Sequence, residues 1–377
     1  MTGKRPGGSD GDGVIGSMGL AGTDPIPGSP AEVTAEWLSG VLSRPDRPVV
    51  VDRVDVTPIG TGQTGATYRA AVTYRGTAPD LPDSFVVKLP AQDEAVRERV
   101  APSYRSEHAF YTCVADTVAV PLPRCHYCGL AGDGAQFVLL LDDMAPAQQG
   151  DQIRGCTVAE ARLAAEALAG LHGPRWCDPA WLTFAGTVMP KPDEPTARGL
   201  GDITRLAAQT AVEKLGARMS AADRTTVLDS ADLIAAWLLG SPDRFSLLHG
   251  DYRIDNLLFD PDRTRVTVVD WQTLAVGLPA RDLAYFVATS LQPDERARHE
   301  RELAEAYRQA LASYGVSDYD TETCWQDYRF GMLQIPLITT LGFAFSSSTE
   351  RGDDMALAML ERGCRAIREL GTLELVR

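Results

Sequence analysis

The spacing of apolar residues along the chain changes near residue 145. Before that point, apolar side chains lie in short runs that partly alternate with polar ones, and turn-forming residues separate these runs. Five runs have the character of β-strands, at residues 49–59, 66–76, 84–90, 124–129 and 136–141. The pattern predicts a small, mostly antiparallel sheet.

Two stretches of the same region have helical spacing instead. Residues 30–44 place their apolar side chains on one helical face, with Ser29 positioned as the cap and Pro30 in the first turn. The second stretch, residues 103–116, follows Pro102, which we expect to break the segment before it. The sheet should therefore be accompanied by one main helix.

Beyond residue 145 the helical period dominates. The clearest amphipathic pattern is at residues 157–173, and similar ones follow at 202–217, 220–239, 281–291, 294–314, 320–342 and 353–370. One short hairpin, over residues 256–271, interrupts them. We therefore predict an α+β protein with two lobes. Residues 1–29, rich in Gly, Pro, Ser and Asp, are expected to be a disordered leader, residues 30–145 the small sheet lobe, and residues 146–377 the larger, mainly helical lobe.

The charge of the chain bears on whether nucleic acid is a partner. Lys and Arg number 36 against 51 Asp and Glu, which gives a formal charge of −15. Binding to nucleic acid needs a basic face, so an acidic surface argues against it. The same surface would suit a cationic substrate, although a solvated acidic surface that aids solubility is an equal alternative. No stretch is long and apolar enough to predict a membrane span.

The seven cysteines are odd in number and irregularly spaced. Because no secretory signal precedes them, we expect reduced thiols in a cytoplasm. Cys125 and Cys128 form a lone CxxC, whereas a zinc site usually needs a second pair. A turn between two strands is the expected role of this segment. Nothing in the sequence indicates an oligomeric state.

The most specific chemical pattern is HGDYRIDN, residues 249–256, followed by a hydrophobic hairpin whose second strand ends in Asp270. Phosphoryl transfer to a hydroxyl requires a carboxylate at the hydroxyl proton, an oxygen ligand for a metal ion, and a second carboxylate between the metal and the phosphates. Asp251, Asn256 and Asp270 fit these roles in that order. The alternative is that they are turn and capping residues, as Asp and Asn often are. His249 is expected to shape the loop, because Asp251 already supplies a base.

A second pattern is the GxGxxG formed by Gly60, Gly62 and Gly65. A dinucleotide-binding version would open a helix, but a strand-like run follows here, so we expect a hairpin tip whose amides approach phosphate oxygens. A plain glycine-rich turn is the alternative. Lys88 favours the phosphate interpretation, because a lysine inside an apolar strand is costly unless an anion pairs with it. Glu107 and the phosphates of ATP are the expected partners.

These residues resemble the aminoglycoside phosphotransferase superfamily, including its choline-kinase-like and ecdysteroid-kinase-like branches. The segments LLHGDYRIDNLLF and VTVVDWQTLAVGLPARDLAYFV carry the resemblance, which extends from about residue 50 to about residue 365. It implies a bilobal protein-kinase-like fold, ATP and Mg²⁺ as cofactors, and phosphorylation of a hydroxyl on a small molecule. By this likeness Asp251 is the catalytic aspartate, Asn256 and Asp270 are metal ligands, and Lys88 with Glu107 orients the phosphates.

Departures from the protein-kinase pattern argue against a protein substrate. Gly250 stands where protein kinases have an arginine, and Trp271 and Gln272 follow the metal-binding aspartate in place of Phe-Gly. Only 11 residues separate Asp270 from Asp282, which we expect to begin or cap a helix. This spacing leaves no room for a long activation loop on which a protein substrate could dock.

The acceptor is the least constrained part of the prediction. We expect its site in the helical insert at 190–220 and in the C-terminal helices near 325–350, with Asp327 and Phe345 as candidate contacts. Candidate acceptors are an antibiotic of the aminoglycoside or nucleoside type, as in resistance, or a metabolic alcohol such as a steroid, a hydroxyacyl thioester or an amino alcohol. Helical core packing is the alternative for the aromatic residues of this region.

Two other function classes compete with an active kinase. A nucleotide-binding pseudokinase scaffold would normally have lost one of the residues needed for phosphate, metal or proton transfer, and the sequence retains all of them. A dinucleotide-dependent oxidoreductase is suggested by the GxGxxG alone, and the strand after that loop argues against it.

Overall fold

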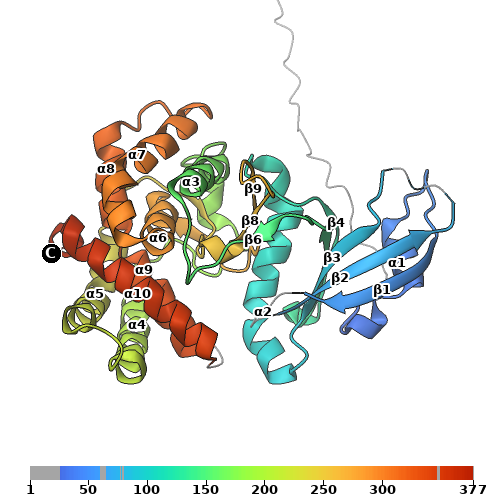
Figure 1. Cartoon of the computed structure of the whole chain (residues 1–377), viewed down its shortest axis with the longest axis horizontal. Coiled ribbons are helices and arrows are strands. Elements are labelled where there is room, and N and C mark those ends of the chain that lie inside the picture. Colours follow the sequence, from blue (N-terminus) through green and yellow to red (C-terminus); the bar gives the residue numbers. More distant parts are fainter. Residues whose placement is uncertain (1–25, 60–64, 77, 79, 346–348, 377) are drawn as a thin grey trace, which may run out of the picture.

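The computed structural model describes residues 26–59, 65–76, 78, 80–345 and 349–376, and these form a small and a large lobe (Figure 1). The small lobe contains a five-stranded antiparallel sheet with the strand order β1-β2-β3-β5-β4. Its strands are β1 (Val51–Pro58), β2 (Gly65–Tyr74), β3 (Ser84–Pro90), β4 (Cys125–Ala131) and β5 (Gln136–Asp142). The predicted α+β class with two lobes is therefore confirmed. The predicted leader falls almost wholly outside the described residues.

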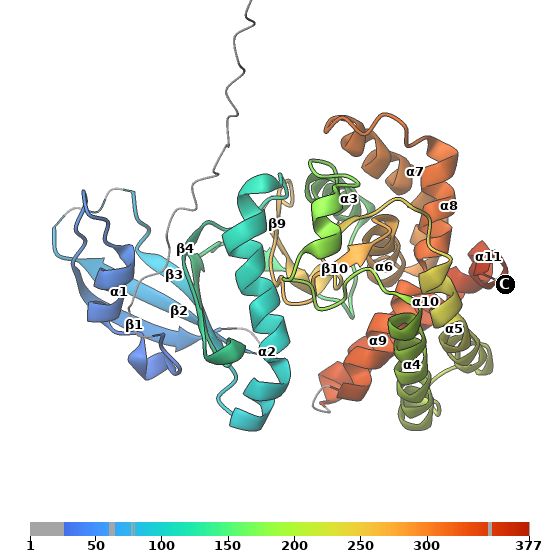
Figure 2. The same ribbon diagram turned by 180° about the vertical axis from the view of Figure 1, so that it is seen from behind.

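The two faces of this sheet enter different cores because side chains alternate along each strand. On β3, Phe85, Val87 and Leu89 pack into a cluster with α1 (Ala35–Leu42), which covers one face. Lys88 lies one residue out of phase and therefore belongs to the opposite face, next to α2 (Glu94–Ala109). Figure 2 shows α2 between the sheet and the large lobe. The strand period thus directs Lys88 toward the junction of the lobes.

Contrary to the prediction, Pro102 does not interrupt a helix. Helix α2 runs through it from Glu94 to Ala109, and Asp93 caps the start by accepting a hydrogen bond from the Val96 N–H. Pro102 is exposed, so the carbonyl that loses its helical donor faces water, and the ring does not disturb the buried face. The helix ends instead in a π-helical turn, Phe110–Val114, and a 3₁₀ turn, Ala115–Thr117.

The large lobe is helical. Its helices are α3 (Val158–His172), α4 (Glu194–Leu215), α5 (Ala221–Leu239), α6 (Ala280–Ser290), α7 (Pro293–Ala312), α8 (Thr321–Gly331), α9 (Gln334–Phe345), α10 (Glu350–Leu370) and α11 (Thr372–Val376). Helix α6 is buried along its whole length and forms the centre of the lobe. The single helix predicted over 320–342 is wrong, because α8 and α9 are separate. Pro336 has no N–H to donate to the Met332 carbonyl, and the helix breaks just before it.

Short strands position the loop over residues 249–256. Strand β7 (Ser246–Leu248) precedes it and pairs with β10 (Ala275–Gly277), while β8 (Leu257–Phe259) follows it and pairs with β9 (Val266–Val268). A two-residue strand, β6 (Gln148–Gln149), adds to the edge of β8. The β8–β9 register continues one step further, since Val269 N donates to the Asn256 carbonyl at 3.0 Å. The hairpin therefore brings Asp270 back beside Asn256, as the sequence predicts.

The cysteines of the CxxC lie in strand β4, which agrees with the strand expected at 124–129 and corrects the expectation that they form a turn. All seven cysteines are free thiols. Burial raises the pKa of Cys125 to about 12 and that of Cys128 well above its usual range. Since the thiolate is the form that binds metals and attacks disulfides, this environment disfavours both roles.

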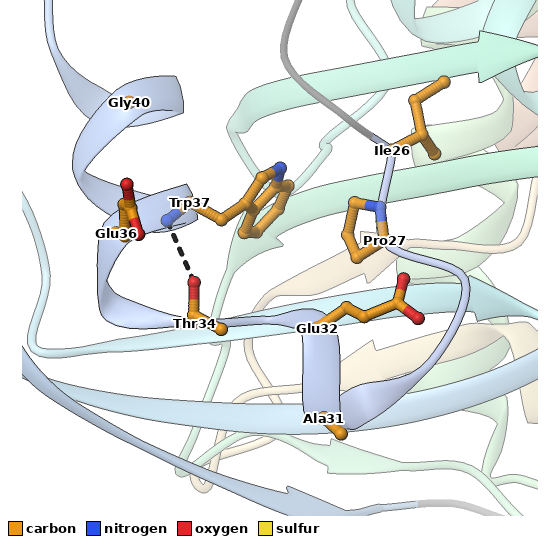
Figure 3. A pocket seen from close by; sticks show the side chains of 8 residues that line it. All are labelled: Ile26, Pro27, Ala31, Glu32, Thr34, Glu36, Trp37 and Gly40. Atoms are coloured by element: carbon orange, nitrogen blue, oxygen red, sulfur yellow. Dashed lines mark hydrogen bonds between the residues drawn. The ribbon is translucent and has the colours of Figure 1, made fainter.

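A hollow on the small lobe, drawn in Figure 3, lies between residues 26–34 and α1. Trp37 forms part of its wall, and the backbone N–H of Trp37 donates to Thr34 Oγ1, which caps α1. None of its lining residues is a predicted site residue. Within the described ranges, none of the helices has the length and apolar character needed to cross a bilayer.

Candidate active site

Asp251 lies in the loop between β7 and β8, and both of its carboxylate oxygens accept hydrogen bonds. Tyr285 on α6 donates its hydroxyl to Oδ1 at 2.9 Å. Arg253 Nε donates to Oδ2 at 2.9 Å, and Asn256 Nδ2 donates to the same oxygen at 3.2 Å. The side chain is 20% exposed. The carboxylate is thus held in one orientation while remaining open to a ligand.

The backbone of this loop is fixed from the large lobe. Asp282, in the first turn of α6, accepts hydrogen bonds from the His249 and Gly250 N–H groups at 2.6 and 3.1 Å. Gln334 on α9 donates to the Gly250 carbonyl at 3.1 Å. Gly250 has a φ of 82°, and a Cβ there would lie 2.0 Å from the Thr273 carbonyl oxygen. Glycine is therefore required at the position where protein kinases have an arginine.

His249 contributes to the shape of the loop. The ring is fully buried, and its Nε2 lies 3.1 Å from the Val269 carbonyl oxygen. The ring centre is 4.7 Å from that of Trp271, which in turn stacks on Phe110 of the small lobe. The imidazole thereby ties the 249–256 loop to the segment that carries Asp270, as expected of a structural residue.

Lys88 joins two carboxylates from different parts of the chain. Its Nζ lies 2.8 Å from Glu107 Oε2 on α2 and 2.6 Å from Asp270 Oδ1 in the large lobe. Burial alone would lower the pKa of Lys88, but the two carboxylates outweigh burial and raise it. Burial raises the pKa of Glu107 more than the ammonium group of Lys88 lowers it, so the net shift is upward. At Asp270 the ammonium group lowers the pKa more than burial raises it, so the net shift is downward. The ammonium group of Lys88 thus joins the two lobes through both carboxylates.

Asp270 turns the chain sharply after β9. Its φ is 71°, in the left-handed region that side chains other than glycine rarely adopt, although Asp tolerates it better than most. The turn directs the carboxylate toward Lys88, and the side chain remains 36% exposed. Backbone strain of this kind is typical of functional positions.

The oxygen atoms of Asn256 and Asp270 fit a magnesium ion. The Asn256 amide nitrogen donates to the Asp251 carbonyl at 2.9 Å as well as to its carboxylate, so the amide oxygen is left for another partner. Asp270 offers the carboxylate oxygen that Lys88 does not bind. Mg²⁺ takes one or two such protein ligands and completes its shell with phosphates and water. In the described part of the chain, no group of three or more His, Cys, Asp or Glu residues is arranged to hold a metal ion by itself.

The glycine pattern is only partly visible. Gly60 and Gly62 lie outside the described residues, whereas Gly65 is the first residue of β2 and pairs with Pro90. Two positions further along, Thr67 faces Lys88. The end of this pattern therefore lies on the strand directly beside the phosphate-orienting lysine.

The two predicted acceptor contacts are not brought together. Asp327 is 2% exposed, and Arg244 donates to both of its oxygens at 2.7 and 2.9 Å. Tyr319 donates to the same carboxylate at 3.0 Å. These contacts make Asp327 an internal ion pair and leave it no free oxygen to offer an acceptor. Phe345, by contrast, is 55% exposed at the end of α9.

Three functional contacts were missed from the sequence. Tyr285 is three residues after Asp282 and shares its face of α6, so the helical period was a usable signal. Arg253 stands inside the HGDYRIDN motif, two residues after Asp251, and its charge was a usable signal as well. Gln334 is more than 80 residues from Gly250, and no local pattern indicates that the two meet.

The two lobes, the loop bearing Asp251 and Asn256, and the ion pairs of Lys88 with Glu107 and Asp270 define a protein-kinase-like phosphotransferase that acts on small molecules. The chain belongs to the phosphotransferase enzyme family, whose family model matches residues 55–320.

The individual proteins that match the chain are only distantly similar to it or match a short part of it. Acyl-CoA dehydrogenase family member 11 of Gallus gallus is 40% identical over 65 residues, which are 16% of this chain and 8% of that protein, so the chain matches only a small part of that relative's length. Plasmodium vivax ethanolamine kinase has a TM-score of 0.47 and 12% identity, with 84% of each chain covered. Macrolide 2'-phosphotransferase type I has a TM-score of 0.44 and 17% identity, covering 86% of this chain and 96% of that chain. Structural similarities this low do not inform the acceptor.

Proposed function

We propose that this phosphotransferase transfers the γ-phosphoryl group of ATP to a hydroxyl of a small molecule. The observation that carries the proposal is the Asp251 carboxylate, which Tyr285, Arg253 and Asn256 hold in one orientation while it stays accessible. A hydroxyl bound at this carboxylate would be aligned for attack on a phosphoryl group, and positioning is most of what phosphoryl transfer asks of a protein.

The neighbouring residues divide the remaining tasks. Lys88, oriented by Glu107, would bind phosphate oxygens once a nucleotide competes with Asp270 for its ammonium group. Asn256 and Asp270 would hold Mg²⁺, which neutralises charge on the phosphates when it is bound. Arg253 places a permanent positive charge beside Asp251, where negative charge develops on the transferring group.

The acceptor belongs to the class of hydroxylated small molecules. Inactivation of an aminoglycoside or nucleoside antibiotic is one possible role, and phosphorylation of a metabolic alcohol is the other. The match to acyl-CoA dehydrogenase family members supports including hydroxyacyl thioesters among the metabolic alcohols to be tested, although it covers only part of each chain.

A transfer screen tests the proposal. The full chain is incubated with ATP and Mg²⁺ against antibiotics, amino alcohols, steroids and hydroxyacyl thioesters, and phosphorylated products are identified by mass spectrometry. Transfer to one class that is lost in Asp251→Asn would support it. ATP binding without transfer to any class would favour a nucleotide-binding scaffold, and binding of NAD in preference to ATP would contradict the assignment.

A further inference from the structure

One face of α9 leads outward from the 249–256 loop. Gln334, in the first turn, touches the loop by donating to the Gly250 carbonyl. An α-helix turns by 100° per residue, so three later side chains point within about 40° of the direction of Gln334: Ile338, Leu341 and Phe345. They therefore continue the line that Gln334 begins, over a length of about 16 Å at 1.5 Å per residue.

The exposure of this line increases with distance from the loop. Gln334 is fully buried, Ile338 and Leu341 are partly exposed, and Phe345 is 55% exposed. Figure 1 shows α10 beside α9, and the start of α10 also approaches the loop, because Arg253 Nη1 lies 3.1 Å from Met355 Sδ. Apolar side chains thus extend away from the catalytic aspartate on two helices that both contact its loop.

The apolar line itself offers no charge to a polycation, because helix α9 contains no charged residue. Three carboxylates on surrounding elements are already paired, Asp354 with Arg218, Asp327 with Arg244, and Asp255 with Arg253. Glu350 and Asp353 lie in the first turn of α10 and not on this line. A polycationic acceptor would need free carboxylates along its length, whereas an aliphatic one needs only apolar surface to cover.

We propose that the acceptor is an alcohol with an aliphatic body, which lies along Ile338, Leu341 and Phe345 while its hydroxyl reaches Asp251. The inference rests on the proposed function, because it assigns the substrate class of that same site. An occupant of this kind is favoured because the apolar line is continuous with the reacting centre and covers surface that would otherwise face water.

The test is a chain-length series of straight-chain primary alcohols, butanol through decanol. Binding to Asp251→Asn is measured by calorimetry, and transfer by the wild-type chain is measured with ATP. Each added methylene should tighten binding by up to about fourfold where it is enclosed and by about twofold on an open face. Leu341→Ser should weaken the binding of the longer alcohols and flatten the trend, with ATP binding unchanged.

Leu239→Ser is the matched control, since Leu239 is also a leucine whose side chain reaches the surface, but it lies on α5 and not on this line. It should leave the trend intact. Absence of a chain-length trend, or equal losses in both variants, would overturn the inference. If the protein transfers phosphate efficiently to an aminoglycoside and does not bind the alcohols, the aliphatic acceptor is refuted and the proposed phosphotransfer stands. Chain-length-dependent binding without transfer to any alcohol or antibiotic would instead refute the proposed function and support the apolar site alone.

Discussion

Replacing Lys88 by methionine tests whether the buried ion pairs hold the two lobes together. Glu107 is almost fully buried and loses the cation that pairs with it in the variant, while Asp270, 36% exposed, can partly rehydrate. Breaking a buried pair by removing one partner costs about 3–5 kcal/mol, and the exposure of Asp270 favours the lower end, about 3 kcal/mol. Lys88→Met should therefore unfold at a clearly lower urea concentration than the wild type.

The loss should depend on pH, with a sign that the pKa shifts determine. Burial and Asp270 already raise the pKa of Glu107, and without Lys88 the largest influence that opposes them is gone. A carboxyl whose folded-state pKa is raised stabilises the fold at low pH and loses that contribution as the pH rises through the folded pKa. The variant can thus protonate Glu107 in mildly acidic solution, and its destabilisation should be larger at neutral pH than there.

Urea unfolding at both pH values measures this difference, with Lys191→Met as the control because Lys191 is an exposed lysine in the same chain. Glu107→Gln in the Lys88→Met background should restore much of the stability at the higher pH, since it removes the unpaired charge. Equal losses at both pH values, or no rescue by Glu107→Gln, would show that Lys88 stabilises the protein by packing and not by charge.

Three further predictions concern the reaction centre. Asp251→Asn should keep nucleotide affinity but lower turnover by about 10²–10⁴-fold, measured separately by titration and steady-state kinetics, and turnover near the wild-type value would refute its role. Asp270→Ala should raise the Mg²⁺ concentration needed for activity more than Asn256→Ala does, because a carboxylate binds a hard cation more strongly than an amide, and equally small effects would place the metal elsewhere. Gly250→Ala should impair activity and cost at least about 1–3 kcal/mol, because its Cβ would meet the Thr273 carbonyl at 2.0 Å, whereas Gly199→Ala, where a Cβ meets nothing within 4 Å, should be tolerated; similar losses in the two variants would contradict the steric argument.

Local patterns carried much of the prediction. The strand expected at 84–90 is β3, and the helix expected at 157–173 is α3, because alternation and the 3.6-residue period are each visible within a few residues. The HGDYRIDN motif also located the loop that bears Asp251 and Asn256, since its spacing is local. These features required no knowledge of distant contacts.

Features that depend on exposure or on distant contacts could not be predicted. Pro102 is tolerated inside α2 because its ring faces solvent, while Pro336 separates α8 from α9 in an otherwise uniform helical pattern, and composition alone does not distinguish the two. Asp327 was a candidate acceptor contact because it is acidic, yet Arg244, 83 residues earlier, pairs with it in the interior. Only the tertiary structure identifies that partner.

The alternation of β3 has a consequence for how this enzyme can evolve. Inserting or deleting one residue upstream in the strand would move Lys88 into the cluster of Phe85 and Val87, and would bring an aliphatic side chain to Glu107. Such a change would bury an unpaired ammonium group on one face and leave Glu107 without its partner on the other. It would therefore be eliminated because the protein is destabilised, whatever its effect on activity. Apolar packing against α1 therefore fixes the strand register that positions the lysine. Natural length variation in this lobe should be confined to the connections between strands.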